Sequence, residues 1–189
     1  MRVLQHLKGT LDMLRTLGTD SMIELATWVD VSYAIHIDMR SHTGGCMSFE
    51  LGVLMPKSTK QKLNTKSSTE AEVGGGSDYI PNVIYTELFL KGQGIILQSN
   101  NFNQDNQSTM KLIVNGKSSC GPGSRHIDIR YSFMKNRLDT ENINVVYCQT
   151  SEMLADFYTK PLQGALFRKF RDAIMGLLHI NTLRMSTTS

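Results

Sequence analysis

Apolar residues recur along the chain at spacings typical of helices in some segments and of strands in others. The opening segment has an amphipathic helical stripe that ends near Gly18 and is formed by Val3, Leu4, Leu7, Leu11 and Leu14. Residues 22–34 form a strand-like run, and two shorter runs at 45–50 and 52–58 flank a turn near Leu51 and Gly52. Three strands in such quick succession predict an antiparallel meander.

A long helix is predicted at residues 67–90. The segment NTKSSTEAE contains two overlapping capping-box patterns, formed by Ser67 with Glu70 and by Thr69 with Glu72. Three consecutive glycines, 74–76, interrupt the helical pattern, and each lowers helix stability by about 1 kcal/mol relative to alanine. Pro81 removes a backbone donor and predicts a kink within this helix.

The second half of the chain alternates between strands and helices. The pattern predicts a strand near 95–106, helices at 107–114 and 125–138, a buried strand at 143–149, helices near 151–158 and 164–178, and a loose tail over the last ten residues. The order βββαβααβα, with helical crossovers between the later strands, predicts an α/β fold in which helices flank a mixed sheet.

Composition favours a folded globular domain. The chain has 189 residues, of which 40% are hydrophobic and 20% charged, enough for one full core and a short appended piece. The formal net charge of +3 is a mild basic excess, which permits nucleic-acid binding without requiring it.

The cysteines and the opening helix bear on the compartment. Cys46, Cys120 and Cys148 are far apart and form no CxxC pair, which argues against a disulfide framework and a zinc ribbon. Charged and polar residues interrupt the opening helix, which excludes a signal-peptide core or a membrane span there. We therefore expect a soluble intracellular protein with no membrane partner.

Acidic residues at the ends of predicted elements are the candidates for chemistry. They are Asp30 in the first strand, Glu70 or Glu72 at the long helix, Asp105 after the fourth strand, and Asp156 after the last strand. Asp30 stands within a mostly apolar strand, where an ionised carboxylate costs several kcal/mol unless a cation or donors compensate it. A pair of magnesium ions, which prefer oxygen ligands, would suit three or four such carboxylates. Sequence spacing alone does not show that these acids converge.

Four segments in order resemble one known family. They read STEAE at 68–72, QDNQS at 104–108, SRHIDIRYSF at 124–133 and LADFYTKPL at 154–162. These segments strongly resemble the RNase H domain of copia-type retrotransposon polyproteins, whose pattern reads STEAEY, DNQSA, KHIDVRYHF and LADxxTKPL. The opening RVLQHLKGTLD is similar to the segment RVLRYLKGT that ends the reverse transcriptase region of the same polyproteins.

The resemblance implies the RNase H fold, a five-stranded mixed sheet with helices on both faces, and a four-carboxylate site for two Mg²⁺ or Mn²⁺ ions. The matching positions are Asp30, Asp105, Asp156 and one of two glutamates. Residues two apart lie about 200° around a helix, so Glu70 and Glu72 cannot both face one site. We predict Glu72 as the ligand, because Val73 follows it as an apolar residue commonly follows this acid in the family. Glu70 is then the cap.

The resemblance also implies partners and boundaries. The expected partners are an RNA/DNA hybrid and the reverse transcriptase region of the same polyprotein, in a cytoplasmic virus-like particle or the nucleus. The predicted nucleic-acid contacts are Ser32, Asn106, Gln107, Arg125 and Lys160. We predict a helix from the reverse transcriptase or connection region at 1–20, an RNase H-like domain at 21–162, and a C-terminal helix with a loose tail at 163–189.

The implied activity is two-metal hydrolysis of the RNA strand of a hybrid during reverse transcription. The alternative is an inactive remnant with a structural or binding role. Ser32 replaces the second acid of the DADWAG pattern, no histidine precedes Asp156 in YCQTSEM, and the three glycines would fit a decaying element. A third reading, an integrase or transposase nuclease of the same fold, fits less well because the TKPL ending belongs to the RNase H pattern.

Overall fold

The computed structural model describes residues 2–19, 23–115 and 125–184, which contain a five-stranded sheet in the order β3-β2-β1-β4-β5. The strands are β1 (Glu24–Ser32), β2 (His42–Ser48), β3 (Leu54–Lys60), β4 (Ser99–Gln104) and β5 (Asn144–Tyr147). The first three strands pair antiparallel, while β4 runs parallel to both β1 and β5. The predicted meander and mixed sheet are therefore confirmed.

In the described part of the chain, one helix precedes the sheet, three connect its parallel strands, and the others follow its last strand. They are α1 (Arg2–Lys8), α2 (Ser68–Gly92), α3 (Gln107–Asn115), α4 (Arg125–Thr140), α5 (Gly164–Ile174) and α6 (Asn181–Arg184), with 3₁₀ helices η2 (Thr150–Glu152) and η3 (Leu154–Tyr158). The long predicted helix is present as α2, which continues through Pro81. Because the crossovers from β3 to β4 and from β4 to β5 are helical, the sheet is covered as the element order predicts.

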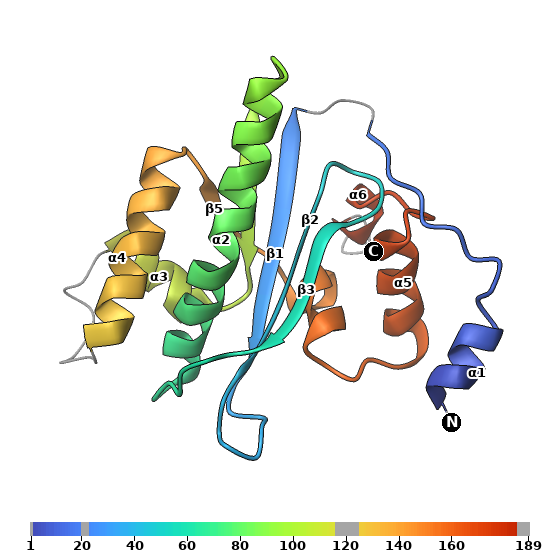
Figure 1. Cartoon of the computed structure of the whole chain (residues 1–189), viewed down its shortest axis with the longest axis horizontal. Coiled ribbons are helices and arrows are strands. Elements are labelled where there is room, and N and C mark those ends of the chain that lie inside the picture. Colours follow the sequence, from blue (N-terminus) through green and yellow to red (C-terminus); the bar gives the residue numbers. More distant parts are fainter. Residues whose placement is uncertain (1, 20–22, 116–124, 185–189) are drawn as a thin grey trace.

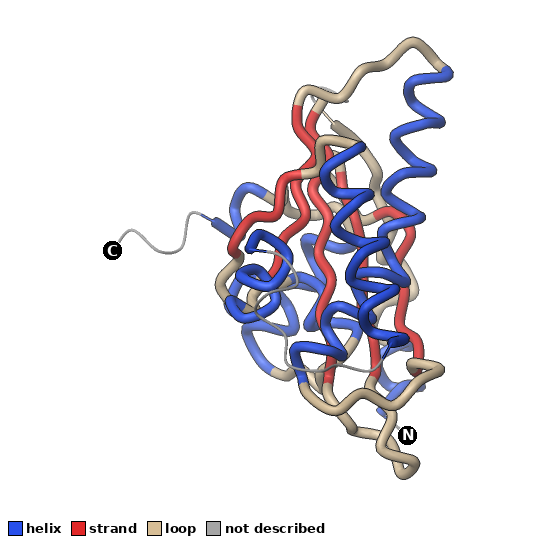
Figure 2. Tube along the Cα trace, turned by 90° about the vertical axis from the view of Figure 1, so that its left-hand side faces the viewer, coloured by secondary structure: helices blue, strands red, loops and turns tan. Residues whose placement is uncertain are grey.

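Each face of the sheet has its own core. Helices α2, α3 and α4 cover one face, whereas η3, α5 and α6 lie on the other (Figures 1 and 2). Successive residues of a strand point to opposite faces, so Val29 enters the core under α2 while Trp28 enters the core under α5. Met47 and Cys46 of β2 divide in the same way. Burial of both faces explains why β1 is apolar along most of its length.

Two of the three consecutive glycines allow α2 to pack closely, Gly75 against the sheet and Gly76 against α4. A Cβ on Gly75 would come within 2.5 Å of Val31 Cγ2 on β1, and one on Gly76 within 2.7 Å of Met134 Cε on α4. At these positions glycine is required for close packing, although it weakens the isolated helix. Close packing therefore accounts for Gly75 and Gly76 without sequence decay, whereas a Cβ on Gly74 would meet no atom closer than 3.4 Å.

Four expectations about local structure are wrong. α1 ends at Lys8, well before Gly18, and the side chains of Leu11 and Leu14 are exposed rather than packed against a partner. β5 is an edge strand with mostly exposed side chains, not a buried strand. The predicted helix near 151–158 consists of two 3₁₀ helices. Part of the predicted loose tail is packed, because Leu183 of α6 is buried.

The segment before β1 contacts the segment after η3 and the connection between β2 and β3. Thr16 N donates a hydrogen bond to Met175 O at 2.8 Å, and Gly18 and Leu51 exchange two backbone hydrogen bonds of 3.1 Å. The domain boundaries at residues 20 and 162 stay a prediction.

Within the described residues, no helix is both long and apolar enough to cross a membrane.

Candidate metal centre

Three predicted acids converge where β1 and β4 end. Asp30 of β1 and Glu72 of α2 are buried, and Asp105 directly follows β4 and is half-buried. Each offers a carboxylate oxygen, and the three oxygens lie within 4.8 Å of one another. β1 and β4 are parallel neighbours, so their carboxyl ends lie at the same end of the sheet. The first turns of α2 reach this end as well.

Two donors hold the Glu72 carboxylate. Val31 N donates to Glu72 Oε1 and Gln104 Nε2 donates to Glu72 Oε2, both at 3.3 Å. The other end of the Gln104 amide accepts hydrogen bonds from Asp105 N at 2.9 Å and Asn106 N at 3.2 Å. Gln104 therefore connects two of the three acids, and its amide orientation is set by the two backbone donors.

The sequence analysis missed Gln104. It was taken as part of the QDNQS motif without a role, although one signal was available. Gln104 lies two residues after Phe102 in a strand, so both side chains lie on the same face. The structure shows that Gln104 is fully buried there, where a side-chain amide needs polar partners.

Glu70 caps the helix instead of entering the site. Glu70 N donates to Ser67 Oγ at 3.2 Å, and Glu70 Oε2 accepts from Lys66 N at 2.7 Å. The bond to Ser67 satisfies a free backbone donor in the first turn of α2, as the capping-box pattern predicts, whereas the Glu70 carboxylate bonds the residue before the cap instead of Ser67 N. Of the two glutamates, the structure places Glu72 with Asp30 and Asp105.

Asp156, the fourth predicted acid, lies beside this group on η3 and is buried. Its Oδ1 accepts from Lys160 Nζ at 2.7 Å, and the same ammonium lies 3.6 Å from Asp30 Oδ1. Thr159 Oγ1 donates a hydrogen bond to Asp30 Oδ2. Asp156 thus contacts the other acids through Lys160 and is not a member of the three-carboxylate cluster.

Gly44 allows η3 to approach β1 this closely. It pairs with Asp30 in the β1–β2 register. A Cβ on Gly44 would lie 2.7 Å from Thr159 Cγ2 and 2.8 Å from Ala155 O. A side chain on β2 at this position would therefore push away the segment that carries Asp156, Thr159 and Lys160.

Burial and mutual repulsion oppose ionisation of the acids. Burial raises the pKa of Glu72 well above its usual value, and the charges of Asp30 and Asp105 add to this effect. The pKa of Asp105 is raised by burial and by Asp30. Burial also raises the pKa of Asp156, against the opposing hydrogen bond from Lys160. Burial lowers the pKa of Lys160, but its carboxylate neighbours outweigh that and raise it overall.

The predicted nucleic-acid contacts lie in different settings. Gln107 is exposed at the start of α3, whereas Asn106 Oδ1 caps that helix by accepting from Thr109 N at 3.0 Å. Ser32 Oγ donates to Thr159 O at 3.1 Å. Lys160 lies among the acids. The side chain of Arg125 lies outside the described residues.

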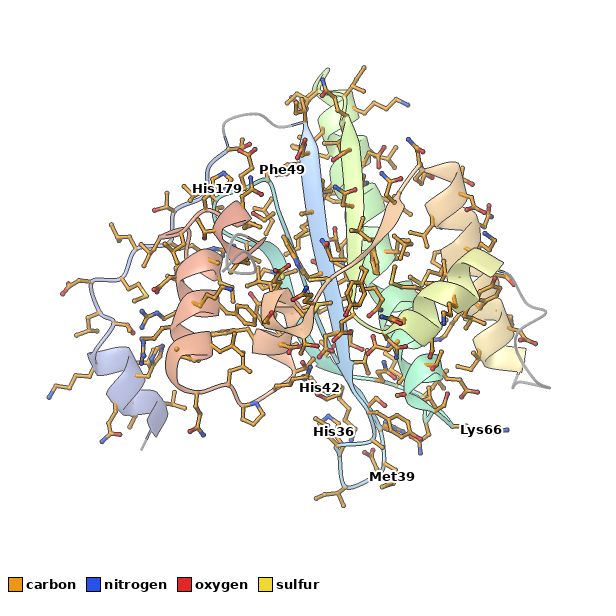
Figure 3. All side chains as sticks on the ribbon, turned by 180° about the vertical axis from the view of Figure 1, so that it is seen from behind. His36, Met39, His42, Phe49, Lys66 and His179 are labelled. Carbon is orange, nitrogen blue, oxygen red and sulfur yellow. The ribbon has the colours of Figure 1, made fainter. Side chains whose placement is uncertain are left out.

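An apolar cavity of about 430 Å³ lies far from the acids. Its lining includes Phe49, Leu54, Tyr85 and Phe89. In Figure 3, Phe49 lies at the opposite end of the sheet from His42, which pairs in register with Ser32, two residues beyond Asp30. The cavity contains no acid and does not belong to the metal centre.

Curated relatives of the chain are transposon polyproteins. It is 31% identical over 174 residues to the retrovirus-related Pol polyprotein from transposon TNT 1-94 of Nicotiana tabacum, covering 91% of this chain and 13% of that protein. It is 30% identical over 172 residues to that of transposon RE2 of Arabidopsis thaliana, covering 89% and 12%. The transposon Ty1-JR1 Gag-Pol polyprotein of Saccharomyces cerevisiae is 28% identical over 142 residues, covering 74% and 8%. The chain thus spans 8% to 13% of the length of these relatives.

Solved structures with a similar fold are RNase H domains. The N-terminal RNase H domain of a Mycobacterium tuberculosis protein has a TM-score of 0.53 and 11% identity, covering 78% of this chain and 98% of that one. LC11-RNase H1, isolated from compost, has a TM-score of 0.53 and 11% identity, covering 72% and 93%. No family model matches the chain. The chain is therefore a homologue of one segment of the Pol polyproteins of copia-type transposons, and its fold is that of the RNase H domains.

Proposed function

We propose that this domain is an endoribonuclease that hydrolyses the RNA strand of an RNA/DNA hybrid with Mg²⁺ or Mn²⁺. The observation that carries the proposal is the convergence of Asp30, Glu72 and Asp105 at the buried end of β1 and β4, with Asp156 beside them. Solvent-exposed carboxylates would need no cation to neutralise them, whereas Asp30, Glu72 and Asp156 are buried, Asp105 is half-buried, and the charges of Asp30 and Asp105 act on Glu72.

The residues fit a hard divalent cation. Mg²⁺ and Mn²⁺ favour carboxylate oxygens, and the three convergent carboxylates supply them. A cation would remove the repulsion that raises the pKa of Glu72 and Asp105. Two such ions, when bound, activate a water molecule and stabilise the leaving oxygen of a phosphodiester.

The protein's own residues pre-organise the centre. Asp30, Glu72 and Asp105 would hold the first ion, and Asp156 would complete a second position. Gln104 and Val31 N fix the Glu72 carboxylate, and Thr159 fixes Asp30. Because each of these donors is itself held by backbone or packing, the oxygens need little rearrangement on binding.

A fold relative and the exposure of two predicted contact residues support the proposed substrate class. LC11-RNase H1 is known in complex with an RNA/DNA hybrid, and its fold matches this chain with a TM-score of 0.51 over 69% of it at 10% identity. Contacts to the 2′-hydroxyl groups would let the domain tell RNA from DNA. Of the predicted contact residues, Gln107 is exposed and the Lys160 side chain is 36% exposed, so both would be accessible to the hybrid. We further propose that the domain acts attached to the reverse transcriptase region, as in its polyprotein relatives.

Cleavage of a strand-labelled hybrid tests the proposal. The purified chain with Mg²⁺ or Mn²⁺ should cut the RNA strand and leave the DNA strand intact. Asp105→Asn should abolish cleavage while hybrid binding survives, because the change removes one charge from the cluster and preserves the shape of the side chain. Glu70→Gln, at the helix cap outside the cluster, is the matched control and should still cut.

Two results would contradict the proposal. If the wild type and Asp105→Asn both bind the hybrid and neither cuts it, the domain is an inactive remnant with a binding role. If Asp105→Asn cuts as well as the wild type, the acids named here are not the catalytic ones.

A further inference from the structure

Lys160 places a positive charge inside the acidic centre. Its Nζ donates to Asp156 Oδ1 at 2.7 Å and lies 3.6 Å from Asp30 Oδ1. The two carboxylates are nearly inaccessible, with side chains 2% and 4% exposed, whereas the Lys160 side chain is 36% exposed. The ammonium therefore bridges two buried acids and still borders solvent.

The backbone of Lys160 is fixed by hydrogen bonds to other backbone groups, whereas its ammonium pairs with the two carboxylates. Lys160 N donates to Asp156 O at 2.8 Å and Leu162 N donates to Lys160 O at 2.9 Å, so the backbone is fixed next to the acids. The side chain reaches the acids through four methylene groups and can turn toward solvent without moving the backbone. The Lys160–Asp156 contact is thus an ion pair that can open while η3 stays in place.

The acids divide into two groups around Asp30. On one side, Asp30, Glu72 and Asp105 bring three oxygens within 4.8 Å of one another. On the other side, Asp30 and Asp156 share the Lys160 ammonium. The hydrogen bond from Lys160 falls in the second group, so an ion between Asp30 and Asp156 would compete with the ammonium for the same oxygens.

We propose that Lys160 is a built-in cation that occupies the second ion position, between Asp30 and Asp156, and must leave before a second divalent ion binds there. This inference rests on the proposed function, because it concerns the order in which that centre takes up its ions. The centre then takes one ion readily and a second ion only as Lys160 turns away.

Substrate would favour the exchange. A phosphate group of a bound nucleic acid offers the displaced ammonium another anion. Lys160 would then neutralise Asp156 in the free domain and contact phosphate in the complex. This arrangement couples uptake of the second ion to the arrival of substrate.

Counting bound Mn²⁺ tests the inference in the full chain without any cleavage assay. Free Mn²⁺ is followed by electron paramagnetic resonance at neutral pH as protein is titrated. The wild type should bind one Mn²⁺ tightly and a second weakly. A charge within about 4–6 Å changes a carboxylate's affinity for a proton by roughly tenfold or more, so Lys160→Met should tighten the second site by roughly tenfold or more. Lys160→Arg keeps the charge and should resemble the wild type.

Controls separate competition from general charge and from misfolding. Lys135→Met removes another lysine paired with an aspartate four residues away, on the surface of α4, and should change neither site. Lys160→Gln retains a donor for Asp156 and should also tighten the second site if Lys160→Met unfolds. In Lys160→Met, the further change Asp156→Asn should remove the gained site.

The outcomes distinguish this inference from the proposed function. If no protein, wild type included, binds Mn²⁺ at the cluster, the proposed function fails. If the wild type binds a first Mn²⁺ but folded Lys160→Met and Lys160→Gln bind the second no better, the proposed function stands and the role of Lys160 is overturned.

Discussion

Replacing Gly75 by alanine would place a methyl group between α2 and the sheet. The new Cβ would lie 2.5 Å from Val31 Cγ2 and 3.2 Å from the side chain of Thr43. Both neighbours are β-branched residues on central strands, so neither can rotate freely out of the way. The helix must therefore move away from β1, and Glu72, one turn earlier in α2, should move with it.

Gly74→Ala provides the matched control in the same helix. Its Cβ would meet only the far end of Arg130, with Nη1 at 3.4 Å, and the side-chain amide of Gln61 at 3.7 Å. Both substitutions gain about 1 kcal/mol of helix propensity. Overpacking costs Gly75→Ala about 1–3 kcal/mol in addition. Gly75→Ala should thus be less stable than Gly74→Ala by about 1–3 kcal/mol, because the propensity gain cancels between them.

Unfolding of the two variants followed by circular dichroism measures this difference. In a chain of this size each kcal/mol corresponds to roughly 2–4 °C in melting temperature. Gly74→Ala should melt at or above the wild type and Gly75→Ala below Gly74→Ala. Gly75→Ala should also bind Mn²⁺ more weakly, since Glu72 retreats from Asp30. Equal melting temperatures for the two variants would refute the close-packing explanation of the glycines.

Three further predictions concern the site and the helix that carries it. Gln104→Met should destabilise the fold by about 1–3 kcal/mol in urea unfolding, because it leaves Asp105 N and the Glu72 carboxylate without their partner. The same change should weaken Mn²⁺ binding, and an unchanged Mn²⁺ affinity would contradict this role of Gln104. Because burial and repulsion raise the pKa of Glu72 and Asp105, the metal-free fold holds protons that the unfolded chain releases. The stability of the metal-free fold should therefore fall as pH rises from about 4 through the raised pKa values of Glu72 and Asp105. Thermal melts across pH should show a steeper fall in the wild type than in Asp105→Asn, and equal slopes would disprove this. Ser67→Ala should lower stability by about 0.5–2 kcal/mol in the same melts, because the hydrogen bond from Glu70 N to Ser67 Oγ is lost. Ser68→Ala, at an exposed position next to the cap, is the control, and a smaller effect for Ser67→Ala than for Ser68→Ala would contradict the capping role.

The sequence by itself determined the order of the elements and the candidate acids. The start of α2 was predictable because a helix cap is a contact between residues only three apart, and Ser67 accepts from Glu70 N as expected. Asp30 was recognisable because an acid in an apolar strand is costly unless it has a partner. The choice of Glu72 over Glu70 followed from the period of a helix together with the family resemblance.

Tertiary structure decided which side chains meet, because those contacts join distant parts of the chain. Thr159 lies 129 residues from Asp30 and donates to it, and Gln104 reaches Glu72 across 32 residues. No local pattern encodes such distances. The bridging position of Lys160 likewise depends on η3 packing against Gly44 of β2.

The errors in local structure have the same physical origin. The apolar stripe of the opening segment predicted a helix to Gly18, but its exposed leucines show no packed face within the described residues, and the helix ends at Lys8. A short helix without such packing is only marginally stable. β5 was predicted as buried from its apolar composition, yet its place at the edge of the sheet leaves it exposed. The three glycines weaken an isolated helix, and only the proximity of Val31 and Met134 explains two of them, Gly75 and Gly76.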